Sequence, residues 1–564
     1  MEGNRIRLAS DFYITRDGTP AASIVVRTGA PDKVMEAARD LQDIIRRMSG
    51  AELPICDDAF RVEGNKILLG PSGYTRIHNV VFPEQKGEWC LLRRREDTLV
   101  LAGNDEGCYT GTQFAVTMLL ERLGCGWFGP EELWQVIPQK KTLTVGYLDI
   151  LHTPQFSCRR TRVLEKNPEI GRRWYQGGDK SLIEHAYSIL FPREQYFEAH
   201  PDWYCMHGGV RDPYNNRSIH LESWQMCYSN PELAQATADK VIAFFDANPD
   251  YASYSLAAND GMYEGFCECE ECQKWGMPGE VMMEFVNRVA RLTAAKYPDK
   301  TLYFFVYFPT FDPPNRFIQA EPNVQLMFCK ESCMYHPVDK GPDCGYHEDY
   351  EFEFRYTQYP RPWRQTMEKW LEMTGLSSFC IWEWYCPAAC VTSWEHLPWV
   401  QGDVATRNQR FWHDKGATFV FYDQGPNDYY HDTEKSYPLR WPLWYVVSKG
   451  MWDKDLTGTD ILTDACKKLF EQAADVMLSY YLALADISRD CHAKNIAWQS
   501  AEPYEFYTPA AIERVDRILA RAAQLLDEVS GPVRARMENQ MALWEACKRQ
   551  VEASYSGSAY QPIY

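Results

Sequence analysis

Several kinds of segment are missing from this chain of 564 residues, and each absence excludes a class of protein. The sequence has no apolar run of membrane length, so a membrane-spanning protein is not expected. It has no phosphate-cradling Gly-rich loop and no dinucleotide fingerprint, and it lacks internal repeats, low-complexity tracts and coiled-coil heptads. A hydrophobic content of 45% without such features predicts a soluble globular protein with a large buried core.

Basic residues are also in short supply. The chain has 59 Lys and Arg against 78 Asp and Glu, which gives a net charge of −19. Nucleic acids and anionic membranes need basic surfaces, so neither is expected as a partner. The first residues, MEGNRIRLASDFYITRDG, lack the apolar core of a signal peptide, and we expect a cytoplasmic protein. The 19 cysteines are odd in number and scattered, which favours buried thiols over a disulfide framework.

Aromatic residues, in contrast, are plentiful. They make up 14% of the chain, with 19 Trp and 34 Tyr. Aromatic rings stack on the apolar faces of sugars, and they also build ordinary cores. The excess therefore suggests a carbohydrate substrate without establishing one.

Three regions differ in pattern. Residues 1–150 predict a mixed α/β domain, with a strand at 22–28 and amphipathic helices at about 32–49 and 109–123. Residues 151–452 alternate strand-like runs with helices, and 453–564 predict a C-terminal helical domain. The eight strand-like runs of the middle region are 156–163, 203–208, 224–229, 253–260, 301–309, 324–332, 376–385 and 417–425. Helices are expected between several of them, at about 231–246, 280–296, 361–374 and 403–414. This alternation predicts an α/β fold built on a (β/α)₈ TIM barrel.

The segment 253–275 contains the features on which the functional interpretation depends most. It begins as a strand and breaks at Asn259-Asp260-Gly261, a tripeptide that favours a turn. Barrel enzymes place their catalytic groups where strands end, so Asp260 is a candidate catalytic carboxylate. A surface turn whose acidic residue has no catalytic role would have the same sequence pattern.

Other strand ends also carry polar and aromatic residues. Glycoside hydrolysis needs one acid for the leaving oxygen, one carboxylate that attacks, stabilises or activates water, and aromatic platforms for the ring. We predict Asp260 as the general acid and Glu383 or Asp423 as base or nucleophile. Structural roles remain open: Glu383 can bond a neighbouring Arg, and Asp423 can cap the following turn. The predicted substrate-binding residues are Arg160, Arg162, His207, Asn259, Tyr307, Lys330, Glu331, Trp382, Trp384 and Tyr422. Strand alternation places Arg160 and Arg162 on one face and Arg159 on the other.

Three thiols, Cys267, Cys269 and Cys272, fall within six residues. Together with a fourth ligand they could hold a structural zinc ion, and Cys227, Cys205 and His207 are the candidates for that ligand. A complete four-ligand motif is not visible in the sequence, so incidental buried cysteines remain the alternative. No cofactor is expected to be required for catalysis.

The central segments resemble a bacterial family known as domain of unknown function 4838. The likeness rests on LAANDGMYEGFCECEECQKW, on the helix VMMEFVNRVA and on LRWPLWYVVSKGMWDKDL, and it covers roughly 155–455. The order Asn259-Asp260-Gly261, then the cysteine cluster, then Phe285-Val286-Asn287 matches the family in spacing. The resemblance implies a glycosidase-like TIM barrel and supplies no substrate.

The first region is similar to the small domain that precedes the barrel in family 67 α-glucuronidases and family 20 hexosaminidases. ARDLQDIIRRMSGAELPI and EGCYTGTQFAVTMLLERLGCGWFGP carry this likeness. Family 20 enzymes have an Asp-Glu pair where this chain has Asn259-Asp260, which argues against their N-acetyl-assisted mechanism. Likeness to the inverting α-glucuronidases implies Glu383 and Asp423 in the base role and Asp260 or Glu331 as acid. It also implies that Arg160 or Lys330 pairs with a uronate.

We therefore predict a cytoplasmic, exo-acting glycoside hydrolase, α-glucuronidase-like or hexosaminidase-like, whose partner is an oligosaccharide or glycoside. Two alternatives remain: a lyase or metal-dependent sugar-processing enzyme on the same barrel, and a non-catalytic carbohydrate-binding barrel. The sequence leaves the formation of a homodimer open.

Overall fold

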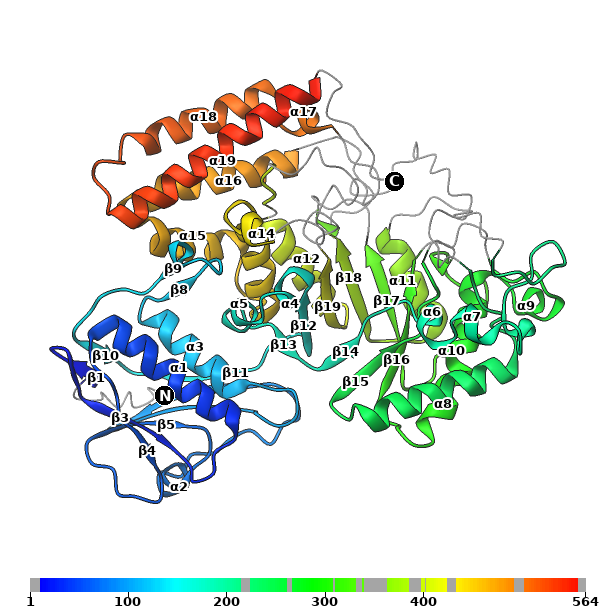
Figure 1. Cartoon of the computed structure of the whole chain (residues 1–564), viewed down its shortest axis with the longest axis horizontal. Coiled ribbons are helices and arrows are strands. Elements are labelled where there is room, and N and C mark those ends of the chain that lie inside the picture. The colour runs from blue at the N-terminus through cyan, green and yellow to red at the C-terminus, as the bar shows by residue number, and fades with distance from the viewer. Residues whose placement is uncertain are drawn as a thin grey trace, which may run out of the picture.

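The computed structural model describes residues 11–214, 224–260, 266–307, 310–330, 337–338, 363–384, 397–400, 402–423, 433–490 and 502–555. An N-terminal sheet, a central barrel and a group of C-terminal helices follow one another along the chain (Figure 1). Among the described helices, none combines the length and the hydropathy that crossing a lipid bilayer requires.

The N-terminal sheet has six strands in the order β11-β6-β7-β5-β3-β4. Helices α1 (Asp32–Ser49) and α3 (Gly111–Arg122) pack side by side on it, as predicted (Figure 1). Helix α1 ends at Gly50, whose φ of 79° suits glycine and whose N–H bonds Arg46 O. The strands are β3 (Ala22–Val26), β4 (Ile55–Asp57), β5 (Asn65–Leu69), β6 (Cys90–Arg95), β7 (Thr98–Gly103) and β11 (Asp149–His152). Smaller elements are β1 (Phe12–Arg16), β2 (Thr19–Pro20), α2 (Gly73–Ile77), β8 (Gly126–Trp127), β9 (Gln135–Val136) and β10 (Leu143–Val145).

The central sheet has eight strands in the order β13-β12-β19-β18-β17-β16-β15-β14. Neighbouring strands run parallel except for β13, which is antiparallel to β12. Only Asp179 separates β13 from β14, which lies at the other edge, so the sheet curls into a nearly closed TIM barrel. The strands are β12 (Cys158–Thr161), β13 (Gly177–Gly178), β14 (Lys180–Leu182), β15 (Tyr251–Ser255), β16 (Thr301–Val306), β17 (Val324–Lys330), β18 (Phe379–Trp384) and β19 (Ala417–Asp423).

Helices cover the outside of the barrel. The four helices predicted between the strands are confirmed as α8 (Pro231–Ala247), α10 (Pro278–Ala294), α11 (Trp363–Thr374) and α12 (Asp403–Asp414). Helix α14 (Thr433–Trp452) follows β19. The short helices are α4 (Arg162–Glu165), α5 (Pro168–Arg173), α6 (Tyr187–Leu190), α7 (Arg193–Tyr196) and α9 (Glu270–Trp275).

Two of the predicted barrel strands are wrong. Segments 203–208 and 224–229 are not part of the barrel sheet, although an isolated antiparallel bridge, Tyr204↔Met226, joins them. Their apolar residues are buried for another reason, since Trp203 packs on Phe191 and Tyr204 on Trp224. A segment buried in such a cluster has the same short run of apolar residues in its sequence as a buried strand. Two strands of the barrel sheet were not predicted. Strand β13 has only two residues, both glycine, and β14 has three and begins with a lysine, which leaves little pattern to detect.

After the barrel the described chain is helical. The helices are α15 (Gly458–Phe470), α16 (Ala474–Asp490), α17 (Pro503–Phe506), α18 (Pro509–Ala523) and α19 (Gly531–Tyr555). The side chain of Thr457 caps α15 and that of Thr508 caps α18, each by accepting a backbone N–H of the first turn. Buried Arg536 of α19 donates to Leu133 O, Gln135 O and Leu469 O, which ties these helices to the β8–β9 region.

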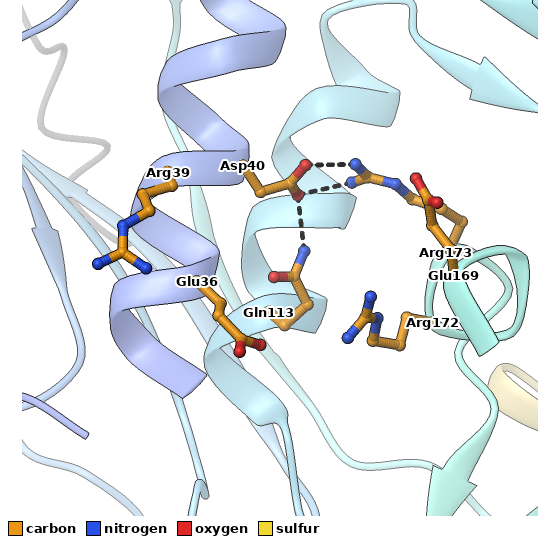
Figure 2. A pocket seen from close by; sticks show the side chains of 7 residues that line it. All are labelled: Glu36, Arg39, Asp40, Gln113, Glu169, Arg172 and Arg173. Carbon is orange, nitrogen blue, oxygen red and sulfur yellow. Dashed lines mark hydrogen bonds and ion pairs between the residues drawn. The ribbon is translucent and has the colours of Figure 1, made fainter. Parts of the chain in front are cut away.

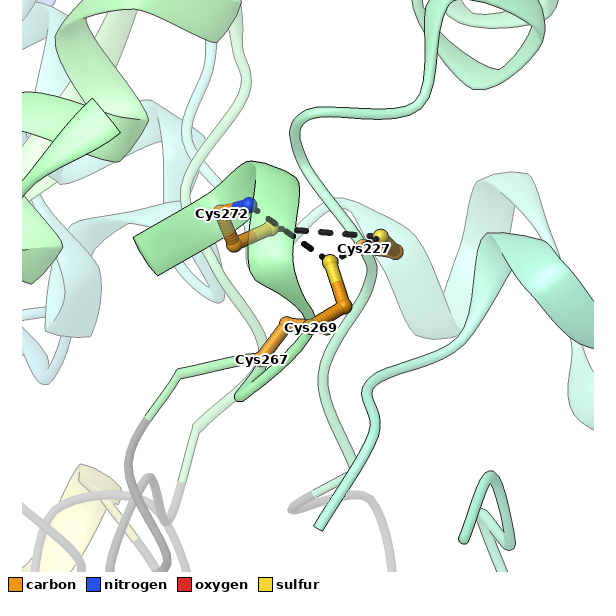
Figure 3. A group of neighbouring side chains, drawn as sticks. All are labelled: Cys227, Cys267, Cys269 and Cys272. Carbon is orange, nitrogen blue, oxygen red and sulfur yellow. Dashed lines mark hydrogen bonds between the residues drawn. The ribbon is translucent and has the colours of Figure 1, made fainter. Parts of the chain in front are cut away.

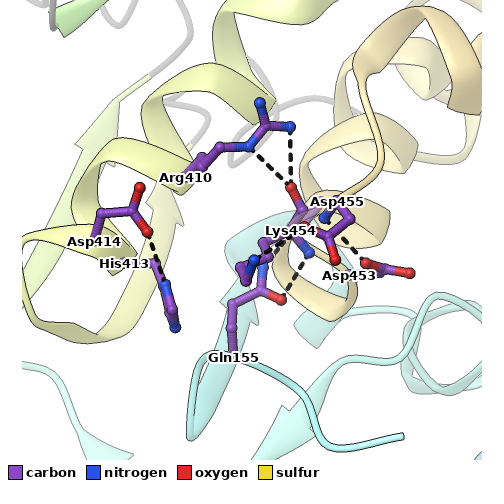
Figure 4. Close-up of polar contacts among 8 residues, drawn as sticks. Gln155, Arg410, His413, Asp414, Asp453, Lys454 and Asp455 are labelled. Atoms are coloured by element: carbon purple, nitrogen blue, oxygen red, sulfur yellow. Dashed lines mark hydrogen bonds and ion pairs between the residues drawn. The ribbon is translucent and has the colours of Figure 1, made fainter.

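Polar side chains fix the end of α14 to the start of the barrel (Figure 4). Gln155 accepts from Lys454 N at 2.8 Å and donates to Gly450 O at 2.5 Å. Arg410 of α12 donates to Lys454 O through two nitrogens at 3.1 and 3.2 Å. The turn after α14 is therefore held from two sides, at the N-terminal end of β12.

A polar hollow of about 300 Å³ lies where α1, α3 and α5 meet (Figure 2). Asp40 accepts from both terminal nitrogens of Arg173 and from Gln113 Nε2 at 2.8 Å. Arg39, Glu36, Glu169 and Arg172 complete the lining. None of the predicted site residues that the structure describes belongs to this lining, so we interpret the hollow as a junction between the N-terminal helices and the barrel.

His152 makes the contact between β11 and the end of α14 dependent on pH. Its ring stacks on Trp452 at 4.4 Å and donates from Nε2 to Trp452 O at 2.9 Å. Burial holds the pKa of His152 below its usual value of 6.5. The unfolded chain therefore binds this proton more readily than the folded chain, and the contribution to stability is present above pH 6.5 and lost as the pH falls. We expect the Tm of the wild type to fall more steeply between pH 7.5 and 5.5 than that of His152→Gln, measured by calorimetry; equal slopes would contradict this.

Candidate active site

The carboxyl ends of the parallel barrel strands meet at one edge of the barrel. Register shows which residues lie level: Arg160 pairs with Phe421, Glu383 with Tyr422, and Trp384 with Asp423. Side chains alternate along each strand between the barrel interior and the surrounding helices. This alternation divides the predicted residues into two groups.

The first group faces the barrel interior around Trp382. Its ring lies 4.8 Å from that of Phe421 and 5.1 Å from that of Phe305, measured between ring centroids. The Arg162 guanidinium is 5.7 Å from the Trp382 ring, and its Nε is 3.1 Å from Asp423 Oδ1. The side chain of Arg162 is 27% exposed and that of Asp423 is 7% exposed. An aromatic platform, a cation and a carboxylate therefore lie together.

Asp260 lies beside a histidine that the sequence did not single out. The distance from His185 Nε2 to Asp260 Oδ1 is 4.0 Å, and the Asp260 side chain is 34% exposed. His185 Nδ1 lies 2.5 Å from Ala258 O, and because a carbonyl only accepts, Nδ1 carries the proton and Nε2 faces Asp260. The sequence carries little signal for His185, because it follows the short strand β14 and is placed in the barrel by a parallel bridge to Ala257.

One ring connects the two sets of groups. Phe305 of β16 lies 5.3 Å from the His185 ring and 5.1 Å from the Trp382 ring. Tyr307 is nearly buried and lies 6.4 Å from His185. Asp260 with His185 and Asp423 with Arg162 therefore flank a common aromatic floor.

Asn259 is fully buried and fixes the chain before Asp260. Its Oδ1 accepts from Ser188 N at 2.8 Å, and its Nδ2 donates to Trp224 O at 2.8 Å. Its backbone carbonyl accepts from Gln225 Nε2 at 2.7 Å. These three bonds orient the turn that carries Asp260, and the amide is already used in making them.

Glu383 belongs to the second group, on the helix-facing side of β18. It pairs with Lys330 at 3.0 Å, and the two side chains are 0% and 2% exposed. Tyr422 shares this side, where its hydroxyl accepts from Gln409 of α12 at 2.8 Å. Burial raises the pKa of Tyr422, and the charge of Glu383 raises it further. The structure therefore does not bring Glu383 together with Asp260 and Asp423 on one face.

Of the remaining predicted residues, Arg160 also faces the barrel interior, beside Phe421, and His207 lies outside the barrel sheet. Arg160 donates to Glu165 and to Ser181 O at 2.9 Å, with its guanidinium 5.5 Å from the Phe421 ring. His207 lies near Glu268, at 3.9 Å, next to the cysteine loop. Glu331 and the side chain of Trp384 fall outside the described residues.

The cysteines converge. The sulfur atoms of Cys227, Cys267, Cys269 and Cys272 all lie within 4.8 Å of one another, and all four residues are buried (Figure 3). Cys227, one of the three candidates for a fourth ligand, thus joins the cluster. Cys205 lies close by and donates its S–H to Met226 O at 3.0 Å.

Solved structures with a similar fold include glycoside hydrolases. A family GH115 4-O-methyl-α-glucuronidase, BtGH115A, described as specific for decorated arabinogalactans, aligns over 97% of this chain and 76% of its own, with a TM-score of 0.57 and 14% identity. A family 89 glycoside hydrolase from Clostridium perfringens aligns over 93% of this chain and 62% of its own, with a TM-score of 0.50 and 8% identity. At these identities the likeness shows a shared fold.

Sequence comparison gives a family as well. No curated protein matches the sequence. The family described as "Domain of unknown function (DUF4838)" matches residues 130–482, in agreement with the resemblance noted from the sequence.

Proposed function

The chain belongs to the family described as domain of unknown function (DUF4838), and from this premise we propose that it is an exo-acting glycoside hydrolase. Its substrate would be an oligosaccharide or glycoside from which it removes a terminal sugar. The observation that carries the proposal is the grouping of Asp260, Asp423 and Trp382 around Phe305 at the carboxyl ends of the barrel strands. Two carboxylates beside an aromatic platform are what hydrolysis of a glycosidic bond needs.

The proposed roles follow from the neighbours of each carboxylate. Asp423 is paired with Arg162, whose guanidinium orients the carboxylate beside the Trp382 platform, which suits a nucleophile or a base. Asp260 is more exposed and faces His185, so it can exchange a proton with the leaving oxygen and then with solvent. Glu383 remains the alternative for the base role and would have to act from the pair it makes with Lys330.

A terminal uronic acid is the finer substrate class we propose. The named α-glucuronidase shares the fold, and Arg162 supplies a partly exposed guanidinium beside the Trp382 platform. Guanidinium groups bind carboxylates through charge-assisted hydrogen bonds.

Replacing Arg162 by Gln tests this specificity. We expect the ratio of kcat/KM for an aryl uronide to that for the matching neutral hexoside to fall about 10–100-fold, the value of one charge-assisted bond. Because Arg162 also contacts Asp423, the ratio is the informative quantity and the absolute rate is not. Arg172→Gln, an exposed arginine in the polar hollow, is the matched control and should leave the ratio unchanged.

The general test is hydrolysis of a panel of aryl α- and β-glycosides, uronides and N-acetylhexosaminides by the wild type and by Asp260→Asn and Asp423→Asn. Turnover of one class that both substitutions abolish would support the proposal. Unsaturated products or an absolute metal requirement would indicate a lyase or a metal-dependent enzyme. Binding of oligosaccharides without turnover would indicate a carbohydrate-binding barrel.

A further inference from the structure

We propose that Cys227, Cys267, Cys269 and Cys272 bind one structural zinc ion as a tetrathiolate site. One ligand comes from the segment that precedes α8; Cys267 and Cys269 come from the residues just before α9, and Cys272 from its first turn (Figure 3). The proposal does not depend on the proposed function, because it concerns the loop beside the barrel and not the chemistry inside it.

The sulfur–sulfur distances fit a tetrahedral zinc ion. Cys227 Sγ lies 3.5 Å from Cys269 Sγ and 3.9 Å from Cys272 Sγ. Four sulfurs at the usual Zn–S distance of about 2.3 Å stand about 3.8 Å apart at the corners of a tetrahedron. Disulfide-bonded sulfurs would be about 2.05 Å apart. The cluster therefore has the spacing of metal ligands and not that of a disulfide.

The polar groups around the four sulfur atoms suit the net negative charge of a zinc ion bound by four thiolates. Met206 N donates to Cys267 Sγ at 3.2 Å, and Cys272 N donates to Cys269 Sγ at 3.5 Å. Arg211 Nη1 lies 3.9 Å from Cys267 Sγ. The Cys272 thiol donates to Ser229 Oγ at 3.1 Å, and this hydroxyl can donate in return once the thiol has become a thiolate. Donors of this kind stabilise metal-bound thiolates and orient them.

Among the described residues, the cysteine cluster stands apart from the large apolar core of the protein. The five buried cysteines, Cys205 included, form a separate small core with Met206 as its partly buried neighbour. Small cores in proteins are commonly stapled by disulfides or metals. A zinc ion would join the segment around residue 227 directly to that around residue 270. Each of these segments also bonds the backbone of residues 203–206, through Cys227 N to Trp203 O and Glu268 N to Met206 O.

A zinc ion at this site would also help to hold the turn that carries Asp260. Gln225 and Trp224, which hold Asn259 from both sides, lie two and three residues before Cys227. Cys267 lies seven residues beyond Asp260 in the sequence. A zinc ion bound by Cys227 would thus help to fix the two residues that support this turn.

Metal analysis of the full chain, purified without chelators, tests the proposal. We expect about one zinc per chain by plasma mass spectrometry, and we expect its loss in Cys272→Ser and Cys227→Ser. Cys205→Ser is the matched control, because Cys205 is equally buried and adjacent but lies outside the ligand set; this variant should keep the zinc. Exchange of the wild type with Co²⁺ should give the intense near-ultraviolet and visible absorption of a tetrahedral tetrathiolate.

Several results would overturn the proposal. The first is wild-type protein that holds no zinc and develops no Co²⁺–thiolate spectrum. The second is purified protein that contains iron in place of zinc. The third is a protein mass two hydrogens lower than the sequence predicts, which would reveal a disulfide. Equal zinc in Cys227→Ser and in the wild type would remove Cys227 from the ligand set. The Co²⁺ spectrum of the wild type decides the matter even if a ligand variant does not fold. Inactivity on the glycoside panel would not affect any of these readings.

Discussion

Replacing Asp260 by Asn is expected to lower kcat for the hydrolysed glycoside about 100–10,000-fold while leaving KM nearly unchanged. Positioned general acids contribute rate factors of this size, because they act in the transition state more than in the bound substrate. The asparagine keeps the shape of the side chain and cannot supply the proton. Asn259, buried and bonded on three sides, should hold the turn in place, so the loss would report on chemistry.

Asp250→Asn provides the control for this experiment. Asp250 immediately precedes β15, at the opposite end of the strand from Asp260, where it lies 3.8 Å from Lys180 at the surface. Its replacement should leave kcat within about twofold of the wild type, since exposed pairs contribute little. Steady-state rates together with calorimetric Tm values for both variants separate lost catalysis from lost folding. Retention of kcat in Asp260→Asn would remove Asp260 from the catalytic set.

The alternation of strand-like runs with helices predicted the barrel, and the polar residues at the ends of those runs, such as Asp260, predicted which edge to inspect, because both signals depend on local sequence. Strand alternation also predicted correctly that Arg159 faces away from Arg160, which contacts Phe421 inside the barrel. Register between strands could not be read from one sequence. The Lys330–Glu383 pair and the Trp382–Phe421 contact depend on it.

The missed elements have a common cause. Strand β14 and His185 belong to a short segment with few apolar residues, and their place in the barrel depends on pairing with β15. Segments 203–208 and 224–229, in contrast, look like strands because aromatic packing and the cysteine cluster bury them. A run of apolar residues in the sequence shows that a segment is buried, but it does not show which part of the protein packs against it. For the same reason the sequence could name Cys227 as a candidate ligand without choosing it.

Replacing Glu88 by Gln is expected to lower the free energy of unfolding by about 3–5 kcal/mol, the cost of leaving a buried charge without its partner. Glu88 bonds Arg159 of β12, and the two side chains are 2% and 0% exposed. Arg159 also donates to Tyr175 O at 2.8 Å and to Phe156 O at 3.0 Å, and its guanidinium lies 5.3 Å from the Trp452 ring. The pair therefore connects the N-terminal sheet with the first barrel strand, where neither charge can reach water.

Urea unfolding followed by circular dichroism measures this cost, and two variants isolate its cause. Asp43→Asn breaks a pair with Arg46 whose side chains are 48% and 52% exposed, so it should change stability by less than about 0.5 kcal/mol. The double variant Glu88→Gln/Arg159→Met removes both charges and should recover part of the loss, because the penalty of Glu88→Gln comes from the stranded guanidinium. A double variant less stable than Glu88→Gln would show that the hydrogen bonds of Arg159 to Tyr175 O and Phe156 O contribute more than its charge costs.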